Sequence, residues 1–294
     1  MTPTARRIVI SGAGGQVGGF LAARAAAEGR DVLALTSTQW DITDADAAAR
    51  IVRFGDVVVN CAAYTAVDAA ESDQQRAFAV NATGPEQIAN ACARVGARLI
   101  HISTDYVFSG DFGGAGSQGP HPYELDDATG PLSVYGRSKL AGETAVLESS
   151  ADATVVRTAW VYTGASGGKD FVAVMRGLAA GTRAVTVVDD QVGSPTYVPD
   201  LVGALLQVVD EPMDARLLHA ANAGAVSRFE QARAVFAATG ADPDRVSPVG
   251  SADSPRPAAR PPYSALSGVE SARAGLTPLR DWHDALIDSL RAGR

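Results

Sequence analysis

Short apolar segments alternate with alanine-rich helical segments through the first two-thirds of the chain. The apolar segments are rich in Val and Ile and are hydrophobic on both faces, which is typical of parallel strands buried on both sides. We expect these strands at 7–11, 31–36, 56–60, 98–103 and 154–159. This order predicts an α/β protein with a Rossmann-like, doubly wound parallel sheet and helices on both faces.

The helical segments between these strands end where the sequence offers stop signals. Glycines at 29 and 96 follow the first and third segments, in the position that favours a left-handed helix end. The predicted helices span 16–28, 44–53, 72–95 and 133–149, and a closing amphipathic helix spans 279–292.

Two other regions lack this pattern. The region 109–131 has no periodicity and is crowded with glycines and other turn formers, which predicts a long loop that is either a lid or disordered. The segment 253–263 is kept extended by its prolines.

A chain of 294 residues can bury a large core in one or two domains. We expect a dinucleotide-binding domain over 1–160 with a return around 187–225. A smaller C-terminal substrate-binding domain is expected from 161–186 and 226–294.

Charge and composition argue against some classes of binding partner. The formal net charge of −8 argues against nucleic acid or an anionic membrane as the main partner. No run of 18 or more apolar residues is present, so no membrane span is expected. The first strand follows a short polar tail that lacks the features of a signal peptide, so we expect a cytoplasmic protein.

Cysteines and histidines give no sign of a metal site. Cys61 and Cys92 lie in apolar or helical surroundings and are interpreted as small core residues. The four histidines lack ligand spacing, so we predict no metal. His101 alternates within its apolar segment, and we interpret it as a strand residue rather than a base.

A glycine-rich turn joins the first strand to the first helix. Glycines at 12, 15 and 18 form G-x-x-G-x-x-G, which allows a sharp turn, close approach of the backbone to a pyrophosphate and close helix packing. The free N–H groups of the helix N-terminus would then face the phosphates. We therefore predict that a dinucleotide binds here.

Residues after the second strand indicate which dinucleotide is preferred. Thr36, Ser37 and Thr38 bring neither an acid for a ribose 2′-hydroxyl nor an arginine for a 2′-phosphate. Because hydroxyls do not repel a phosphate, we favour NADPH, with NADH as an alternative. Asp41 and Ile42 are the expected adenine contacts.

Tyr135 and Lys139 are four positions apart and share one face of the predicted helix 133–149. A lysine charge beside a phenol lowers the pKa of the phenol, which gives a tuned proton donor. Taken alone, the spacing more often marks an ordinary solvated helix face, because Tyr-x-x-x-Lys is common.

Longer phrases make the interpretation specific. Ser-Thr-Asp-Tyr-Val-Phe at 103–108, Arg-Thr-Ala-Trp-Val-Tyr at 157–162 and Asp-Gln-Val-Gly-Ser-Pro-Thr at 190–196 are the most diagnostic. Others lie at 12–18, 40–44, 59–68, 80–84, 135–139 and 260–267. Over nearly its whole length the chain resembles the dTDP-4-dehydrorhamnose reductases, a family of extended short-chain dehydrogenases/reductases.

The resemblance implies reduction of the 4-keto group of dTDP-4-dehydro-L-rhamnose to dTDP-L-rhamnose. In this interpretation Thr104 hydrogen-bonds the substrate carbonyl and Tyr135 protonates its oxygen. Lys139 binds the nicotinamide ribose and favours the phenolate form of Tyr135. The expected catalytic residues are thus Thr104, Tyr135 and Lys139.

Further contacts are implied by the same resemblance. The expected cofactor-binding residues are Gly12, Gly15, Gln16, Val17, Asp41, Ile42, Ala62, Ala63, Tyr64, Tyr135 and Lys139. The expected substrate-binding residues are Thr104, Asp105, Tyr135 and Trp160. Trp160 would lie against the sugar, although an indole also fills a core well. Asn81 bonds backbone near the site or only faces a turn. A pocket wall between the two domains is expected from Gln191, Gly193 and Pro195.

One departure from the family concerns assembly. Relatives carry a glutamate after the glycine loop that helps to bind a dimer-bridging Mg²⁺, whereas this chain has Gly19 and Phe20 there and no acid before Glu28. We therefore expect a monomer or a weak homodimer that is not bridged by Mg²⁺.

Two other functions stay open at this point. The chain could reduce another dTDP-4-keto-6-deoxysugar by the same mechanism, or it could be a non-catalytic regulatory subunit of the same fold. Thr104, Tyr135 and Lys139 together argue for catalysis. A dehydratase is disfavoured because an Asp-Glu pair does not follow Thr104.

Overall fold

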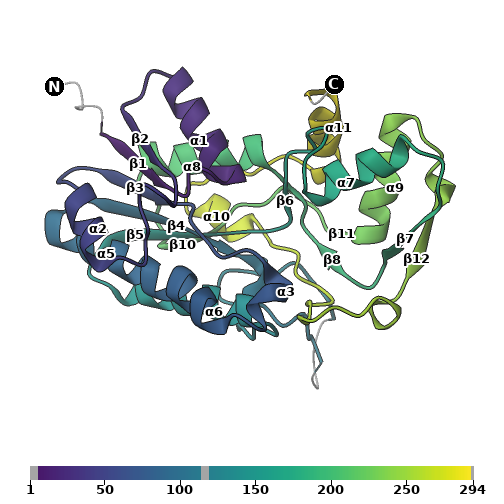
Figure 1. The fold of residues 1–294 in the computed structure, drawn as a ribbon, viewed down its shortest axis with the longest axis horizontal. Helices are drawn as coiled ribbons and strands as arrows, with labels where there is room; N and C mark the ends of the chain where they lie inside the picture. Colours follow the sequence, from purple (N-terminus) through teal and green to yellow (C-terminus); the bar gives the residue numbers. More distant parts are fainter. Residues whose placement is uncertain (1–5, 114–118, 293–294) are drawn as a thin grey trace.

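The structure is a computed structural model that describes residues 6–113 and 119–292. It has two lobes (Figure 1): a larger one built on a central sheet and a smaller one made mainly of the last third of the chain. The polar tail proposed before the first strand and part of the glycine-rich loop lie outside the described residues. No described helix is long and apolar enough to cross a membrane.

The sheet of the larger lobe has six strands in the order β10-β5-β4-β3-β1-β2, all parallel. The strands are β1 (Ile8–Ser11), β2 (Val32–Leu35), β3 (Val57–Asn60), β4 (Arg98–Thr104), β5 (Asp152–Thr158) and β10 (Leu217–His219). The predicted doubly wound parallel sheet is confirmed, because the first five strands coincide with the apolar segments of the sequence to within two residues.

Helices cover both faces of the sheet (Figure 1). One face packs against α1 (Gln16–Ala27) and α8 (Val198–Asp210), which share a core of buried aliphatic side chains with β1 and β3. The second core lies between the sheet and the opposite helix layer. That layer contains α2 (Ala45–Ile51), α5 (Gly84–Val95) and α6 (Val134–Glu148).

The strand order reverses at β1, which pairs with β2 on one side and β3 on the other. In open α/β sheets a crevice forms at such a reversal, beyond the carboxyl ends of the strands. Ser11 and Asn60 are the last residues of β1 and β3 and face each other in the register. The segments that follow these two residues therefore form the walls of the crevice.

The segment predicted as one helix over 72–95 is helical in three parts. It contains α4 (Gln74–Phe78), a single turn of π-helix (Ala79–Thr83) and α5, and it is preceded by the short α3 (Val67–Ala70). The wide turn has no signal in the hydrophobic pattern, because one π turn shifts the helix face by little more than a residue.

The smaller lobe has a core of its own formed by α7 (Phe171–Ala179), α9 (Arg228–Thr239) and α11 (Trp282–Ala292) with short strands. Three strand pairs accompany these helices: β7 (Val185–Val188) with β12 (Val246–Val249), β8 (Val192–Gly193) with β11 (Val226–Ser227), and β6 (Val161–Tyr162) with β9 (Thr196–Tyr197). The short α10 (Val269–Arg273) packs near β10.

The chain returns to the larger lobe after this excursion, since α8 covers the sheet and β10 extends it. This return supports the domain boundaries expected from the sequence, which stay a prediction.

Within the long loop 109–131, the ring of Tyr123 stacks on that of Phe108 with centroids 3.9 Å apart, and the backbone of Tyr123 forms an isolated β-bridge with Leu266. The described parts of the loop contain no helix.

Candidate active site

The glycine-rich turn lies directly against the chain that leaves β3. Gly12 has a φ of +68°, and a Cβ placed on it would lie 2.6 Å from the backbone nitrogen of Ala62. A Cβ on Gly18 would lie 2.4 Å from the carbonyl oxygen of Gly12. These contacts leave no room for side chains, so the turn, Ala62 and Ala63 present bare backbone and methyl groups to the crevice.

This arrangement fits a dinucleotide. Gly15 is the N-cap of α1, and the first N–H groups of that helix have no carbonyl partner within the helix. An anion at this place would gain both hydrogen bonds and the favourable end of the helix dipole. Val17 is half-buried against the core and helps to seat the helix.

Gln16 has a second task that the sequence did not indicate. Its side-chain amide donates to the carboxylate of Asp170 at 2.9 Å, across the boundary between the lobes. Asp170 also accepts from the hydroxyl and the N–H of Thr163. The side chain of Gln16 thus links the turn to the smaller lobe, and its backbone is what suits a phosphate.

The adenosine end of the crevice follows β2. The hydroxyl of Thr36 lies 2.9 Å from that of Thr38 and donates to Gln39. The carboxylate of Asp41 accepts hydrogen bonds from the N–H and the hydroxyl of Thr43 and so stabilises the turn in which both residues lie. Ile42 is only 3% exposed, so an adenine ring would meet its backbone rather than its side chain.

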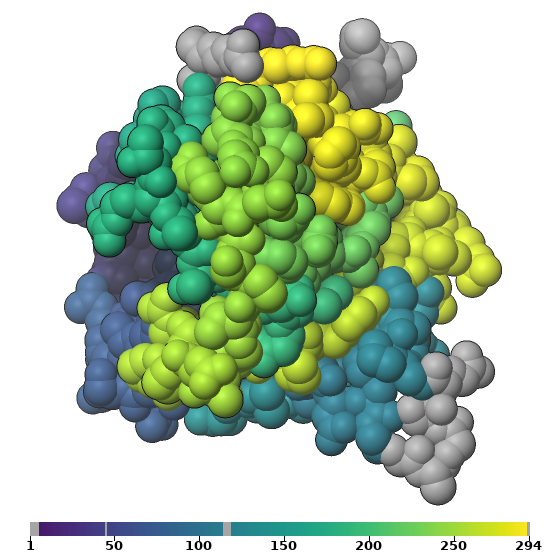
Figure 2. Space-filling view, turned by 90° about the vertical axis from the view of Figure 1, so that its right-hand side faces the viewer, coloured from purple at the N-terminus to yellow at the C-terminus, as the bar shows by residue number. Residues whose placement is uncertain are grey.

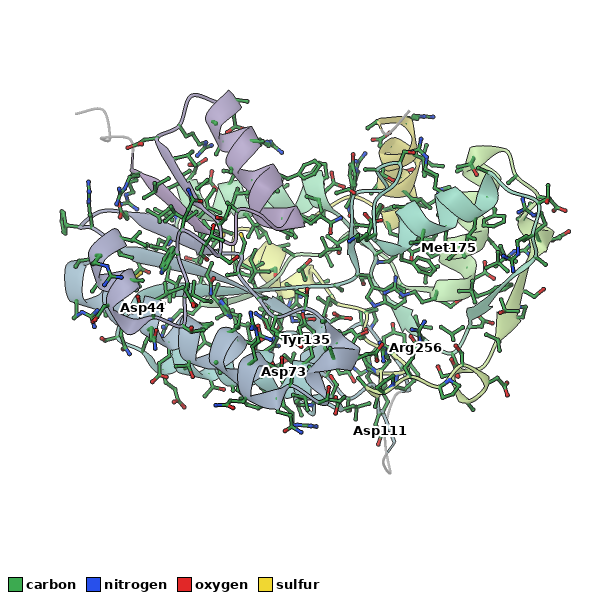
Figure 3. All side chains as sticks on the ribbon, viewed as in Figure 1. Asp44, Asp73, Asp111, Tyr135, Met175 and Arg256 are labelled. Atoms are coloured by element: carbon green, nitrogen blue, oxygen red, sulfur yellow. The ribbon has the colours of Figure 1, made fainter. Side chains whose placement is uncertain are left out.

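The three expected catalytic residues come from two elements. Thr104 is the last residue of β4, and Tyr135 and Lys139 lie one turn apart on α6. Ser133 caps α6 by accepting from the N–H of Gly136. Figure 3 shows Tyr135 near the middle of the molecule, on the side of the larger lobe that faces the smaller one.

Glycines bring α6 close to its neighbours. A Cβ on Gly136 would lie 2.2 Å from the carbonyl oxygen of Tyr106, and one on Gly142 would lie 2.0 Å from that of Asn81. No heavy atom tolerates such a contact. The position of the helix that carries Tyr135 therefore depends on both glycines.

Asn81 lies in the π turn and bonds backbone beside the site. Its side-chain oxygen accepts from the N–H of Tyr64 at 2.8 Å, and its amide donates to the carbonyl oxygen of Tyr64 and to Ser138. The interpretation that Asn81 bonds backbone near the active site is confirmed. Through Tyr64 and Ser138 it ties the exit of β3 to α6.

The electrostatics of Tyr135 differ from the expectation. Burial raises the pKa of Tyr135 well above its ordinary value, and a hydrogen bond with Thr104 opposes this rise only in part. The expectation that Lys139 lowers the pKa of Tyr135 is wrong for this structure, because the lysine amine points elsewhere. A phenol with a raised pKa holds its proton at neutral pH.

Lys139 is almost completely buried, at 2% exposure. Its amine donates to the carbonyl oxygen of Ile102 at 2.7 Å and lies 3.4 Å from the Nε2 atom of His101. Burial lowers the pKa of Lys139 to about 8, while Glu143 and Cys61 act in the opposite direction. This lysine can therefore lose its proton near neutral pH.

Asp105 orients the side chain of Thr104 through a hydrogen bond. The hydroxyl of Thr104 donates to one carboxylate oxygen of Asp105 at 3.0 Å, and that of Ser264 donates to the other at 2.6 Å. Burial raises the pKa of Asp105 to about 6, and these two donors moderate the rise. Both carboxylate oxygens are used within the protein, so Asp105 orients Thr104. Ser264 was missed, although it lies in the diagnostic phrase 260–267.

Asp105→Asn is expected to change how stability depends on pH. Because the pKa of Asp105 is higher in the folded protein, about 6 against 3.8, folding loses stability as pH rises through this range. The neutral amide avoids that loss, so the variant should be more stable by about 3 kcal/mol at pH 7 and show little advantage at pH 4. Urea unfolding at both pH values measures this, and an advantage that is equal at both would contradict it.

Trp160 is the only non-glycine residue with a positive φ, 46°, among the described residues. Its indole lies against Gly193, where a Cβ would be 2.4 Å away, and the guanidinium of Arg228 stacks on the ring at 3.4 Å from the centroid. Gly193 thus lies against Trp160, and its place in a pocket wall stays a prediction. Arg228 was missed, since it lies outside every diagnostic phrase.

The other two residues expected in that wall lie on either side of β8. Gln191 donates to Ser251 at 2.8 Å, and Pro195 lies between β8 and β9. Figure 2 shows a hollow between the teal residues of the smaller lobe and the purple and blue N-terminal residues.

Within the described ranges, no three acidic, histidine or cysteine side chains gather in a way that could hold a metal.

A separate cavity of about 640 Å³ lies at the opposite edge of the sheet. It is lined by Arg30 and Arg98 near the amino ends of the strands. Ligands of open α/β sheets bind at the carboxyl ends, so this cavity does not belong to the crevice described above.

The chain is similar to known proteins over nearly its whole length. The family described as RmlD substrate binding domain matches residues 6–294. The dTDP-4-dehydrorhamnose reductase of Mycobacterium tuberculosis is 66% identical over 292 residues, which is 99% of this chain and 95% of that protein. A probable dTDP-4,6-dihydroxy-2-methyloxan-3-one 4-ketoreductase of Streptomyces antibioticus is 43% identical over 96% of this chain and 94% of its own length.

A solved structure is similar over the full fold. The dTDP-4-dehydrorhamnose reductase of Bacillus anthracis, determined in complex with NADP, is 32% identical and superposes with a TM-score of 0.89. The match covers 98% of this chain and 100% of the other.

Proposed function

The chain belongs to the dTDP-4-dehydrorhamnose reductase family, and we propose that Thr104, Tyr135 and Lys139 carry out its reaction. The protein is an NADPH-dependent oxidoreductase that reduces the 4-keto group of dTDP-4-dehydro-L-rhamnose to give dTDP-L-rhamnose. The assignment of residues to roles rests on one observation above all: Thr104 and Tyr135 interact at the carboxyl end of β4, beside the dinucleotide crevice.

Each protein group has a distinct part in the reaction. Bound NADPH supplies the hydride. Tyr135 donates its proton to the carbonyl oxygen of the sugar, and because burial raises its pKa the phenol carries that proton at neutral pH. The hydroxyl of Thr104 donates to Asp105 in the free protein and would turn to donate to the same oxygen once the substrate is bound. Lys139 supplies a cation beside the cofactor and, with a pKa of about 8, a source of replacement protons.

The cofactor would be held by the elements described at the crevice. The N-terminus of α1 and the turn at Gly12 and Gly15 suit the pyrophosphate, and Ala62 with Ala63 allows close approach on the other side. Thr36 and Thr38 face the ribose position with hydroxyls. These groups accept a 2′-phosphate without repulsion, which supports the preference for NADPH.

We assign the nucleotide diphosphate of the substrate to the arginines between the lobes. Arg228 lies on Trp160, and its pKa is lowered to about 10 by burial. Arg260 pairs with Asp68 on the larger lobe, and Arg256, labelled in Figure 3, lies on the same segment. An anion there would be attracted by these arginines, and Trp160 would reach the sugar once Arg228 turns toward the phosphates.

We retain two further proposals from the sequence. The protein is a monomer or a weak homodimer without an Mg²⁺ bridge, because the place of the expected glutamate is occupied by Gly19 and by Phe20, which is 45% exposed on α1. It acts in the cytoplasm, where nucleotide sugars are made.

The direct test is NADPH oxidation, followed optically, with dTDP-4-dehydro-L-rhamnose generated in the cuvette. We expect turnover to depend on both compounds, and kcat/KM to be higher for NADPH than for NADH. The competing substrate is the dTDP-4-keto-6-deoxysugar that has not been epimerised. A higher kcat/KM for that sugar would assign the chain to another reductase of the family, and absence of turnover with either would favour a regulatory subunit.

A further inference from the structure

A row of buried polar side chains crosses the sheet beneath the active site. Ser11, Asn60 and His101 lie on β1, β3 and β4 and are aligned by the strand register. All three are 0% exposed. The hydroxyl of Ser11 lies 2.6 Å from Asn60, whose amide nitrogen lies 3.1 Å from the Nδ1 atom of His101. The row ends at Lys139.

The direction of each hydrogen bond in this row can be derived. The side-chain oxygen of Asn60 accepts from the backbone N–H of Ala62 at 3.2 Å, which fixes the orientation of the amide. Its nitrogen must then donate to Nδ1 of His101, so Nδ1 carries no hydrogen. A neutral imidazole has one N–H, and it must lie on Nε2, the atom that faces the amine of Lys139.

This N–H has a consequence for the amine of Lys139. The ammonium form has three donors and no acceptor, so it cannot form a hydrogen bond with the Nε2–H group of His101. The neutral amine has a lone pair and can accept a hydrogen bond from that group. Asn60 also opposes a second proton on the ring, because Nδ1–H would face the amide donor. Burial and the nearby Lys139 both lower the pKa of His101, which agrees with a permanently neutral ring.

We propose that His101 is a positioning residue for catalysis: its Nε2–H, directed by Asn60, holds the amine of Lys139 in place and favours its neutral form. Other titratable groups face the same amine. Cys61 follows β3, and Glu143 lies one turn further on α6, where it is held by Arg157 at 2.8 Å. Burial raises the pKa of Cys61 to about 12, so its thiol is neutral. Glu143 favours the ammonium, and His101 acts against it.

The benefit for the reaction follows from the need to recover a proton. A general acid works best when its pKa lies near the working pH, and Tyr135 must be protonated again after each turnover. A lysine that changes easily between its two forms can release a proton and regain it. This part rests on the function proposed above, whereas the geometry of the row does not.

The chain offers an unusually clear measurement because it contains only two lysines, Lys139 and Lys169. Lys169 is exposed and serves as an internal control. With ¹³C at the ε-carbon of lysine, nuclear magnetic resonance should show two titrating signals. We expect a midpoint near 8 for Lys139 in the wild type, and ¹⁵N-labelled histidine should show His101 neutral with its hydrogen on Nε2.

Asn60→Asp should reverse the polarity of the row. The carboxylate accepts a hydrogen from Nδ1, so Nε2 presents a lone pair to Lys139, and the midpoint of Lys139 should rise by about one pH unit or more. In the double variant with His101→Phe, only the through-space charge of the aspartate remains. Most of the rise should then vanish, while the signal of Lys169 stays unchanged in every variant.

Two results would overturn the proposal. One is a wild-type His101 that carries its hydrogen on Nδ1 or becomes cationic between pH 6 and 9, which can be read even if the variants do not fold. The other is an equal rise in midpoint with Phe or His at 101. If the midpoint moves as expected but the pH profile of kcat does not follow it, the inference about His101 holds and the catalytic role of Lys139 fails.

Discussion

Tyr135→Phe is expected to lower kcat by about 10²–10⁴-fold while leaving the dissociation constant for NADPH nearly unchanged. The ring stays in the cluster with Val134 and Tyr64, so α6 and its packing are preserved. Only the hydroxyl that donates the proton is lost. Single-turnover measurements of NADPH oxidation give the rate, and quenching of protein fluorescence gives the affinity.

The matched control is Tyr162→Phe in the smaller lobe. The hydroxyl of Tyr162 is buried and has no hydrogen-bond partner among the described residues. Its removal relieves an unsatisfied polar group, so this variant should keep full activity and be at least as stable as the wild type. If Tyr135→Phe also kept full activity, Tyr135 would not be the proton donor.

The second large effect is expected for Gly142→Ala, which adds one methyl group and removes no group that transfers a proton. The new Cβ would lie 2.0 Å from the carbonyl oxygen of Asn81, so either α6 or the π turn must move. Overpacking of this kind costs about 3 kcal/mol. Since α6 carries Tyr135 and Lys139, a displacement near 1 Å would also lower kcat by roughly 10²-fold.

Gly177→Ala in α7 is the control for the backbone effect of replacing glycine in a helix. Its Cβ would meet nothing within 4 Å, and alanine is favoured over glycine by about 1 kcal/mol in a helix. The two substitutions should therefore change the free energy of unfolding in opposite directions in urea titrations. A stable, fully active Gly142→Ala protein would show that α6 is not held by Asn81.

The sequence predicted the sheet well because parallel strands that are buried on both faces appear as short, continuous apolar segments. The first five strands contain short runs of Val, Ile, Leu and Ala, because a strand covered on both faces needs apolar residues on both. The sixth strand, β10, escaped the strand list because it has only three residues, too few for a periodic pattern. The π turn at Ala79–Thr83 was missed because it barely disturbs the helical pattern on either side of it.

The site was predictable where a residue acts through a local motif. Gly12 and Gly15 and the Tyr135–Lys139 spacing are such cases, since backbone conformation and helix period fix their placement. Arg228 and Ser264 reach Trp160 and Asp105 from distant segments, and no spacing rule connects them. The electrostatics also depend on burial, which is why the pKa of Tyr135 moved in the direction opposite to that expected.

The late return of the chain to the sheet has a consequence for synthesis on the ribosome. The apolar face of β1 and β3 is covered largely by α8, which begins at Val198, and the sheet is complete only once Leu217–His219 has emerged. A nascent chain that stops near residue 160 leaves this face open to water and to chaperones. Fragments that end before α8 should thus aggregate, and native structure should form only after nearly three-quarters of the polypeptide has been made.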